Sequence, residues 1–204
     1  MLVIRTFRSA DLEALYAISL ATGHVGGDAS HLHQDRKLIG HLYSAPYALL
    51  EPQLALVIED EDGVAGFAIG TSDTEKWQER LAAEWWPKLR RQYADPAAGP
   101  AAEWSADQRR VYAIYHPQRT PRQVVELYPA HLHLNLLERA QGRGAGTMLL
   151  SEWMARASRY GVGATHVGVN SANARAVRFW SKRGFDRLTL DDGGSGRTIW
   201  MGRS

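Results

Sequence analysis

Residues 131–147, HLHLNLLERAQGRGAGT, constrain the fold of this chain more than any other segment. Three leucines alternate with polar residues in its first half, which predicts a strand with one apolar and one polar face. Three glycines follow, just before a helical pattern. Glycines let a ligand approach the backbone and tolerate positive φ, so successive N–H groups can point into one concavity. Because a helix N-terminus adds about half a positive charge there, the segment predicts a phosphate or pyrophosphate site.

The spacing of the glycines excludes two common phosphate-binding motifs. A P-loop ends in Gly-Lys-Ser/Thr, but Gly146 is followed directly by Thr147. A dinucleotide fingerprint, G-x-G-x-x-G, begun at Gly142 needs a glycine where Thr147 stands. The pattern that fits is Q/R-x-x-G-x-G/A, with Gln141, Gly144 and Gly146 at its fixed positions. A glycine-rich turn without a ligand is the alternative explanation.

The composition is that of a globular protein, and we expect residues 1–204 to form a single domain. The absence of cysteine excludes disulfides and thiolate catalysis. The N-terminal residues lack the apolar run of a signal peptide, so we expect a cytoplasmic protein. No apolar stretch has the length that a membrane span needs. With a net charge of +2 and no long basic block, the chain lacks the electrostatic footprint of a nucleic-acid-binding protein.

Hydrophobic periodicity and breaker residues predict alternating strands and helices. The Asp62-Gly63 pair indicates a hairpin turn, and Pro87 is expected to kink or end the helix around it. Capping boxes are predicted at Ser72/Glu75, Ser105/Gln108 and Thr120/Gln123. The expected elements, in chain order, are strand 2–7, helix 9–22, helix 36–43, strand 54–59, strand 64–70, helix 72–89, loop 95–102, helix 105–116, helix 120–128, strand 131–136, helix 145–160, strand 165–169, helix 170–183, and strands 185–190 and 198–201 around a turn at 191–196.

This order of elements resembles that of the GNAT superfamily of N-acetyltransferases over nearly the whole chain. The resemblance is carried by the glycine pattern and by the downstream segment SANARAVRFWSKRGF. The strings GGDASHL, SAPYALLEPQLALVIEDEDGVAGFAIG and VVELYPAHLHLNLL are more closely similar to the acetyltransferase-like domain of the nuclear and cytoplasmic O-GlcNAcase, here as a stand-alone, bacterial-type homologue. The resemblance implies an α/β (α+β) GNAT fold: a central twisted mixed sheet of about seven strands flanked by helices, with splayed strands four and five.

The resemblance also implies acetyl-CoA as co-substrate. The O-GlcNAcase domain lacks a CoA-binding loop, whereas the loop is intact here, and this departure favours CoA binding. Ordinary packing is the alternative role of the apolar positions. The implied contacts are Leu134 and Leu136 for the pantetheine arm; Gln141, Gly142, Arg143, Gly144, Ala145, Gly146 and Thr147 for the pyrophosphate; Asn170 and Asn173 for the pantetheine or phosphate side; and Ala176, Val177, Phe179 and Trp180 along the arm.

Acetyl transfer to an amine requires a neutral nucleophile, a polarised thioester carbonyl and an exit for the thiolate. A lysine-like amine has a pKa of about 10.4, so a base or an ordered water must take its proton. The candidate catalytic residues are His133, Asp28 and Glu138. His133 has the most suitable pKa, although a histidine hydrogen-bonded within the sheet is an equally good interpretation. Asp28 is alternatively a residue that attracts a cationic substrate.

The general acid is missing from its usual position. Family members commonly use a tyrosine in an F-Y-x-x-x-G-F pattern, but this chain has FWSKRGF, with Trp180 in that place. An indole N–H donates a hydrogen bond but is no useful proton donor. Water or Ser181 then assists, the thiolate leaves unaided, or the chain does not catalyse the reaction.

The sequence therefore predicts an acetyl-CoA-dependent N-acetyltransferase. The predicted acceptor is a primary amine, on a small molecule or a lysine side chain, which attacks directly in a ternary complex. The alternative is an acetyl-CoA-binding pseudo-acetyltransferase with an interaction or regulatory role. No metal is expected, because the histidine pair at 131 and 133 has no matching acidic or cysteine ligand nearby. Neither a nucleic acid nor a membrane is expected as a partner, and monomer and homodimer both stay open.

Overall fold

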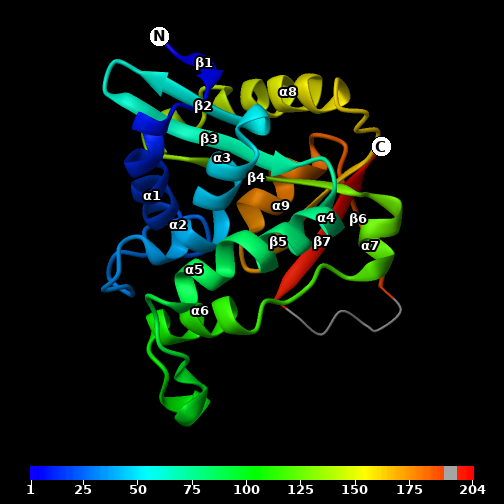
Figure 1. Cartoon of the computed structure of the whole chain (residues 1–204). Coiled ribbons are helices and arrows are strands. Elements are labelled where there is room, and N and C mark those ends of the chain that lie inside the picture. Colours follow the sequence, from blue (N-terminus) through cyan, green and yellow to red (C-terminus); the bar gives the residue numbers. More distant parts are fainter. Residues whose placement is uncertain (191–196) are drawn as a thin grey trace.

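The computed structural model describes residues 1–190 and 197–204, and the turn expected at 191–196 lies outside these described residues. The strands and helices follow the predicted order, except that the helix Ala45–Leu50 was not predicted (Figure 1). In order they are β1 (Val3–Thr6), α1 (Leu12–Ala21), α2 (Leu38–Tyr43), α3 (Ala45–Leu50), β2 (Ala55–Asp60), β3 (Gly63–Thr71), α4 (Thr74–Arg80), α5 (Trp86–Arg90), α6 (Ala106–Tyr115), α7 (Arg122–Leu127), β4 (Ala130–Leu136), α8 (Ala145–Ser158), β5 (Thr165–Asn170), α9 (Ala174–Ser181), β6 (Asp186–Arg187) and β7 (Thr198–Arg203).

Within the described residues, seven strands form one mixed sheet in the order β1-β2-β3-β4-β5-β7-β6. Neighbouring strands are antiparallel except β4 and β5, which are parallel. The hairpin between β2 and β3 turns at Gly63, whose φ is 96°, in agreement with the Asp62-Gly63 signal. This mixed sheet with flanking helices confirms the predicted fold class.

The sheet opens between its two parallel strands. β4 pairs with β5 only at Ala130–Thr165 and His131–His166. Farther along, β4 continues its ladder with β3, whereas β5 pairs with β7. The N–H of Leu137 donates to the carbonyl of Ala65 (2.8 Å), so peptide groups of odd-numbered residues in this strand face β3. Because peptide groups alternate along a strand, those of the even-numbered residues of β4 face the gap.

The two faces of the sheet carry different layers. Phe67 pairs with Asn135 and Ile69 with His133, so these side chains share one face, which α1–α6 cover. Ala68 pairs with Leu134, on the opposite face, which packs against α8 and α9. The polar and apolar faces predicted for the central strand therefore meet different layers of helices (Figure 1). This division places the functional groups described below.

Several helix starts differ from the predicted ones. The cap of α4 is Asp73, not Ser72, because the Asp73 carboxylate accepts the N–H of Lys76 (3.1 Å). Pro87 lies in the first turn of α5, where its missing N–H costs no helical hydrogen bond. The capping box at Ser105 is confirmed, with both reciprocal bonds present. A π-helical turn at Leu81–Trp85 joins α4 to α5.

Two further helix starts and the orientation of one side chain also differ from the predictions. Helix α7 begins at Arg122 with Pro121 as its N-cap, so Thr120 is not the cap. Helix α9 is capped by Asn173, whose side chain accepts the N–H of Ala176, rather than by Asn170 or Ser171. The helical pattern of residues 145–160 also predicts that Met148 faces inward, but Met148 is 43% exposed. Strand β6 spans two residues of the predicted six, since only Asp186 and Arg187 pair with β7.

Candidate active site

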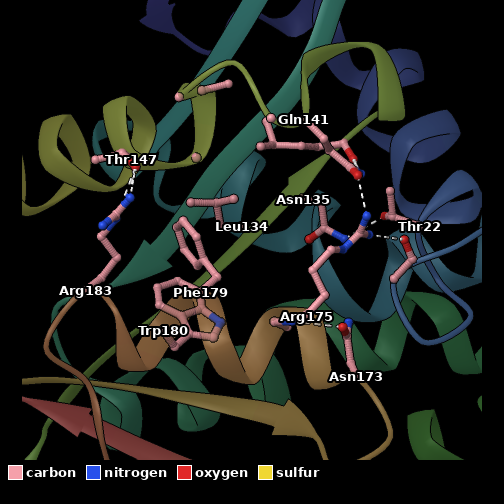
Figure 2. Close-up of a pocket in the computed structure, with 17 residues that line it drawn as sticks. Thr22, Leu134, Asn135, Gln141, Thr147, Asn173, Arg175, Phe179, Trp180 and Arg183 are labelled. Carbon is pink, nitrogen blue, oxygen red and sulfur yellow. Dashed lines mark hydrogen bonds between the residues drawn. The ribbon is translucent and has the colours of Figure 1, made fainter.

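A cavity of about 470 Å³ lies where the glycine segment meets the open side of β4 (Figure 2). We call it the glycine-loop cavity. Its walls come from β4, the glycine loop, the start of α8, helix α9 and the end of α1. The lining residues are Thr22, Gly26, Leu134, Asn135, Leu136, Gln141, Gly142, Gly144, Ala145, Gly146, Thr147, Asn173, Arg175, Ala176, Phe179, Trp180 and Arg183.

The three glycines of the loop serve two different purposes. Gly142 and Gly144 have φ of 71° and 79°, a left-handed conformation that residues with side chains rarely adopt. No heavy atom lies within 4 Å of the Cβ position at either residue, so the loop presents bare backbone. Gly146 lies in the first turn of α8, where a Cβ would come within 3.1 Å of the Phe179 ring. The first two glycines shape the loop, and the third lets α8 and α9 pack closely.

Gln141 connects the loop to both sides of the cavity. Its amide Nε2 donates to the carbonyl of Leu136 (2.8 Å), one of the peptide groups that face the gap. Its Oε1 accepts from the guanidinium of Arg175, which also donates to the carbonyl of Gly26 (3.1 Å). Figure 2 shows Arg175 reaching from α9 toward Gln141 at one end of the cavity. The glutamine of the motif therefore has a structural role in this ligand-free arrangement.

Two guanidinium groups make the cavity suited to an anion. Arg183 donates to the hydroxyl of Thr147 through Nη2 (2.6 Å) and Nε (3.0 Å), and it lies at the opposite end from Arg175 (Figure 2). The N-terminus of the 14-residue helix α8 contributes its own positive field at the glycine loop. Guanidinium groups bind phosphate oxygens in fixed geometry. A phosphorylated ligand fits this electrostatic environment.

The remaining wall of the glycine-loop cavity is apolar. Trp180 is only 6% exposed and packs edge-on against Phe179 (5.1 Å between ring centroids) and Phe185 (4.9 Å). Leu134 lies opposite these rings in Figure 2. Ser181, the other residue considered as an acid, is exposed and is not among the lining residues. The wall fits an extended, mostly apolar ligand arm.

Most residues predicted to contact acetyl-CoA line this cavity, and three do not. Arg143 points its guanidinium toward the carbonyl of Arg139 (3.4 Å). The Asn170 side chain accepts the N–H of Ala172, and Val177 is buried in the core beneath α9. Five lining residues were not predicted from the sequence to line this cavity: Thr22, Gly26, Asn135, Arg175 and Arg183.

One of these omissions left a signal in the sequence. Ala176, Phe179 and Arg183 recur at helical spacing within the predicted helix 170–183, so the pattern places them on one face, and Arg183 lies just beyond the end of α9. Thr22 and Gly26 come from the segment after α1, which no motif connects to the glycine loop. Thr22 accepts a hydrogen bond from Asn135 (2.7 Å) and so ties α1 to the central strand.

A second cavity, of about 360 Å³, lies against the other face of β4. We call it the histidine cavity, because three histidines and five large aromatic residues contribute to its wall. They come from elements spread over most of the chain. The lining residues are Leu42, Tyr43, Tyr47, Trp77, Gln78, Leu81, Trp86, Ala113, Pro117, Gln118, Arg119, Thr120, His131, Leu132, His133, His166, Gly168, Thr198 and Trp200.

The three histidines of this cavity are neutral at physiological pH. Burial lowers the pKa of His133 and that of His166 to about 4, because the charged imidazolium loses its hydration. Burial also lowers the pKa of His131, well below its usual value, and its histidine neighbours add to the effect. Each ring therefore offers one N–H donor and one lone pair.

The other two catalytic candidates lie elsewhere. Asp28 and Glu138 line a third cavity of about 620 Å³, beside the glycine-loop cavity and sharing Arg175 with it. Both carboxylates are exposed. Hydrogen bonds from Ser30 hold the pKa of Asp28 below its usual value, which weakens it as a base. The structure thus separates these carboxylates from His133.

The described residues hold no cluster of three or more histidine, cysteine, aspartate or glutamate side chains that is arranged to hold a metal ion. None of the helices in the described part of the chain is long and apolar enough to cross a membrane.

Comparison with known proteins agrees with this geometry. The splayed mixed sheet with an anion-binding loop at the splay is an acetyltransferase architecture. The chain belongs to the Acetyltransferase (GNAT) family, whose model matches residues 24–185. Members of this family use acetyl-CoA as the acetyl donor.

Among solved structures, the crystal structure of SsHAT is similar over 100% of this chain and 98% of that one, with 34% identity and a TM-score of 0.90. The structure of yncA, a putative acetyltransferase from Salmonella typhimurium with its cofactor acetyl-CoA, shares the fold, with 16% identity and a TM-score of 0.56 over 99% of this chain and 92% of that one. The fold is therefore that of structurally characterised acetyltransferases.

Curated relatives include the protein O-GlcNAcases of Rattus norvegicus and Mus musculus. Each is 25% identical to this chain over 173 residues, which are 82% of the chain. The match spans only 18% of the length of either O-GlcNAcase. The similarity thus concerns one part of those proteins.

Proposed function

We propose that residues 1–204 form a single acetyl-CoA-dependent N-acetyltransferase domain that acts on a primary amine of a small molecule or a lysine side chain. The observation that carries the proposal is the gap between β4 and β5, which has a cavity on either side. An anion-binding cavity for the donor and an aromatic cavity for the acceptor then meet at one strand. Direct attack in a ternary complex follows from this arrangement.

The donor occupies the glycine-loop cavity in this proposal. Backbone N–H groups of residues 142–146 and the Arg183 guanidinium hold the pyrophosphate and phosphate groups, since the N–H groups of Gln141 and Thr147 already donate within the chain. The pantetheine arm lies along Phe179 and Trp180 and pairs with the peptide groups of Leu134 and Leu136, which face the gap. The contact between Arg175 and Gln141 borders the same space, so Arg175 is free to exchange it for a phosphate oxygen when the coenzyme binds.

The acceptor amine reaches the thioester from the histidine cavity. The ammonium group first loses one proton to an ordered water. The lone pair of the neutral nitrogen then attacks the carbonyl carbon, a C–N bond forms, and the carbonyl oxygen takes up negative charge that a β4 N–H stabilises. Collapse of this intermediate breaks the C–S bond and releases the CoA thiolate. The nitrogen loses its proton to His133. Because the pKa of His133 is about 4, transfer occurs once the C–N bond has made the nitrogen acidic.

The leaving thiolate has no acidic side chain from α9 to protonate it. Trp180 fills the position and its ring is buried, so the proton comes from solvent. A cysteine-like thiol has a pKa of about 8.5, and its thiolate leaves without prior protonation. Trp180, at the position where family members commonly have tyrosine, is also the observation that favours the second candidate. This candidate is a pseudo-acetyltransferase that binds acetyl-CoA without transferring the acetyl group.

A thermal-shift titration followed by a thiol-release assay tests both candidates. Acetyl-CoA at about 100 times its Kd is expected to stabilise the fold by roughly 2.7 kcal/mol. This corresponds to a rise in Tm of about 5–10 °C for a chain of this size. The assay then measures free CoA with alkylamines, arylalkylamines and lysine peptides. No shift with acetyl-CoA contradicts both candidates, whereas a shift without thiol release on any acceptor leaves the pseudo-acetyltransferase.

A further inference from the structure

A buried line of hydrogen bonds runs behind the histidine cavity. The Thr74 hydroxyl lies 2.6 Å from the carbonyl oxygen of Pro129 and 2.7 Å from Nδ1 of His131. Nε2 of His131 lies 2.7 Å from the Tyr47 hydroxyl, which lies 3.3 Å from Nε2 of His133. The line thus joins α3, α4 and two positions of β4, and it ends at the catalytic candidate.

The carbonyl oxygen of Pro129 lies at one end of this line of hydrogen bonds, and it determines which atom donates in each of them. A carbonyl oxygen only accepts, so the single hydroxyl proton of Thr74 points to Pro129. The Thr74 oxygen therefore accepts from His131, which must carry its proton on Nδ1. A neutral His131 then has a lone pair on Nε2, so the Tyr47 hydroxyl donates to it. The Tyr47 oxygen accepts in turn from Nε2–H of His133.

The opposite direction requires an ion in the core. If Tyr47 donated to His133, the Tyr47 oxygen would need a second donor, and His131 would have to be protonated on both nitrogens. Burial lowers the pKa of His131 well below its usual value, so this imidazolium is absent at neutral pH. Burial likewise raises the pKa of the Tyr47 phenol, so the hydroxyl stays protonated. If Thr74 donated to His131 instead, all side chains would stay neutral, but the Thr74 and Pro129 oxygens would lie 2.6 Å apart with no proton between them. One arrangement of protons therefore keeps every contact of the line hydrogen-bonded and every side chain neutral.

The neighbouring groups leave this arrangement in place. Trp77 stacks on the Tyr47 ring at 4.3 Å between centroids, and His166 lies 5.3 Å from the His131 ring. Nδ1 of His166 donates to the carbonyl of Tyr128 (2.6 Å), so this histidine is held by a separate bond. Glu51 and Tyr43 are the other titratable groups near Tyr47, and each disfavours the phenolate. The surroundings thus keep the line uncharged.

We infer that Tyr47 is a positioning residue that, with Thr74 and His131, fixes His133 as the tautomer protonated on Nε2, so that Nδ1 is the lone pair available to the acceptor. The inference rests on the proposed function for the role of the acceptor. The tautomer itself follows from the hydrogen bonds and from the neutrality of the buried side chains, without reference to the acceptor. When Nδ1 takes the proton of the amine, the imidazolium keeps its Nε2–H bond to the Tyr47 oxygen, and no proton has to move along the line.

The direct test is the tautomer of His133 in the ligand-free protein. Two-bond 15N–1H correlation spectra of protein labelled at histidine distinguish a ring protonated on Nε2 from one protonated on Nδ1, and H133Q assigns the signals. At pH 7 we expect His133 protonated on Nε2 and His131 on Nδ1. His133 protonated on Nδ1, or a mixture of both forms, overturns the inference. The spectrum needs no coenzyme or acceptor, so its outcome is separate from that of the proposed function.

Two pairs of variants test what holds the tautomer. Y47F keeps the stacked ring and removes the link, so we expect a mixture of His133 tautomers, whereas in Y43F the pattern stays as in the wild type, because the Tyr43 hydroxyl bonds to Arg110 instead. T74V removes the fixed end of the line without touching the histidine cavity, and T74S retains the hydroxyl. We expect mixed tautomers in T74V and the wild-type pattern in T74S. An unchanged pattern in both Y47F and T74V contradicts the inference.

Steady-state kinetics of the same variants distinguish an effect on the position of His133 from a general effect on folding. In Y47F we expect kcat to fall on the order of tenfold, as for other residues that orient a functional group from behind it. KM for acetyl-CoA is expected to stay unchanged, since the donor binds on the other face of β4. T74V is expected to show a smaller fall in kcat that T74S restores. A rise in KM for acetyl-CoA that matches the fall in kcat contradicts a positioning role.

Discussion

The two cavities beside β4 are built in opposite ways. The glycine-loop cavity takes its polar groups mainly from one continuous segment, where φ values and backbone N–H groups determine what binds. The histidine cavity takes side chains from α2, α3, α4, α5, α6, β4, β5 and β7. Backbone N–H groups bind a phosphate whatever the side chains are, whereas a cavity of side chains depends on how each layer packs. In the proposed function, the first cavity binds the donor and the second binds the acceptor.

Among the variants that distinguish the two cavities, we expect replacement of His133 to change activity most. H133Q removes the proposed base from the acceptor side, and the kcat for thiol release is expected to fall by about 10²- to 10⁴-fold. The measurement is steady-state release of CoA with an acceptor that the wild-type protein uses. D28N and E138Q are the matched controls, because both carboxylates lie away from the histidine cavity. A larger loss in either control than in H133Q places the base among the carboxylates.

The buried histidines also predict how stability depends on pH. The pKa of His133 is about 4 in the fold and about 6.5 in the unfolded chain, so unfolding takes up a proton between these values. The stability is fully present above pH 6.5 and is lost as the pH falls toward 4. Between pH 7 and pH 5 the contribution of His133 falls by about 2 kcal/mol.

Urea unfolding of the wild-type protein and H133Q at both pH values measures this term. The drop in unfolding free energy between pH 7 and pH 5 is expected to be smaller in H133Q by about 2 kcal/mol. Titrating groups that do not interact with His133 cancel in this difference, and its histidine neighbours make smaller contributions than its own burial. An equal drop in both proteins shows that His133 is not held neutral by burial.

The backbone cradle is tested by a pair of glycines with the same strain. Gly144 and Gly161 have φ of 79° and 77°, lie at opposite ends of α8, and have no heavy atom within 4 Å of the Cβ position. We expect G144A and G161A each to lose about 1 kcal/mol of stability, from alanine in a left-handed conformation.

Only G144A is expected to bind acetyl-CoA less tightly, by about tenfold, which corresponds to 1.4 kcal/mol. Isothermal titration calorimetry measures both affinities. Equal losses in the two variants indicate a general effect on stability, and they remove the loop from the donor site.

The cations in and just after α9 have the smallest expected effect, because solvent reaches them. Arg183, two residues beyond the end of α9, lines the glycine-loop cavity, whereas Arg178 is an exposed residue of α9 outside it. R183A is expected to weaken acetyl-CoA binding by up to about fivefold at low salt, within the range of exposed ion pairs, and the difference should shrink as salt rises. R178A serves as the control. A similar loss in R178A means that only the general field of the helix matters.

The sequence predicted the fold and the lining of the glycine-loop cavity better than the lining of the histidine cavity. Alternating residues in β4 and the Gly142–Gly146 pattern are local signals, and both correspond to elements of the structure. Helix caps were displaced where two polar residues compete at neighbouring positions, as with Ser72 and Asp73. The link between Tyr47 and His133 spans 86 positions in the chain. No local pattern predicts such a contact, because packing of α3 on the sheet creates it.

The central claim is that donor binding and proton transfer lie on opposite faces of β4. The Kd of acetyl-CoA for H133Q, measured beside the wild-type protein on the samples used for thiol release, tests it most directly. We expect H133Q to bind acetyl-CoA with the wild-type Kd within about twofold, a difference below 0.5 kcal/mol, and to lose thiol release. Loss of acetyl-CoA binding in H133Q, or thiol release that stays at the wild-type rate, contradicts it.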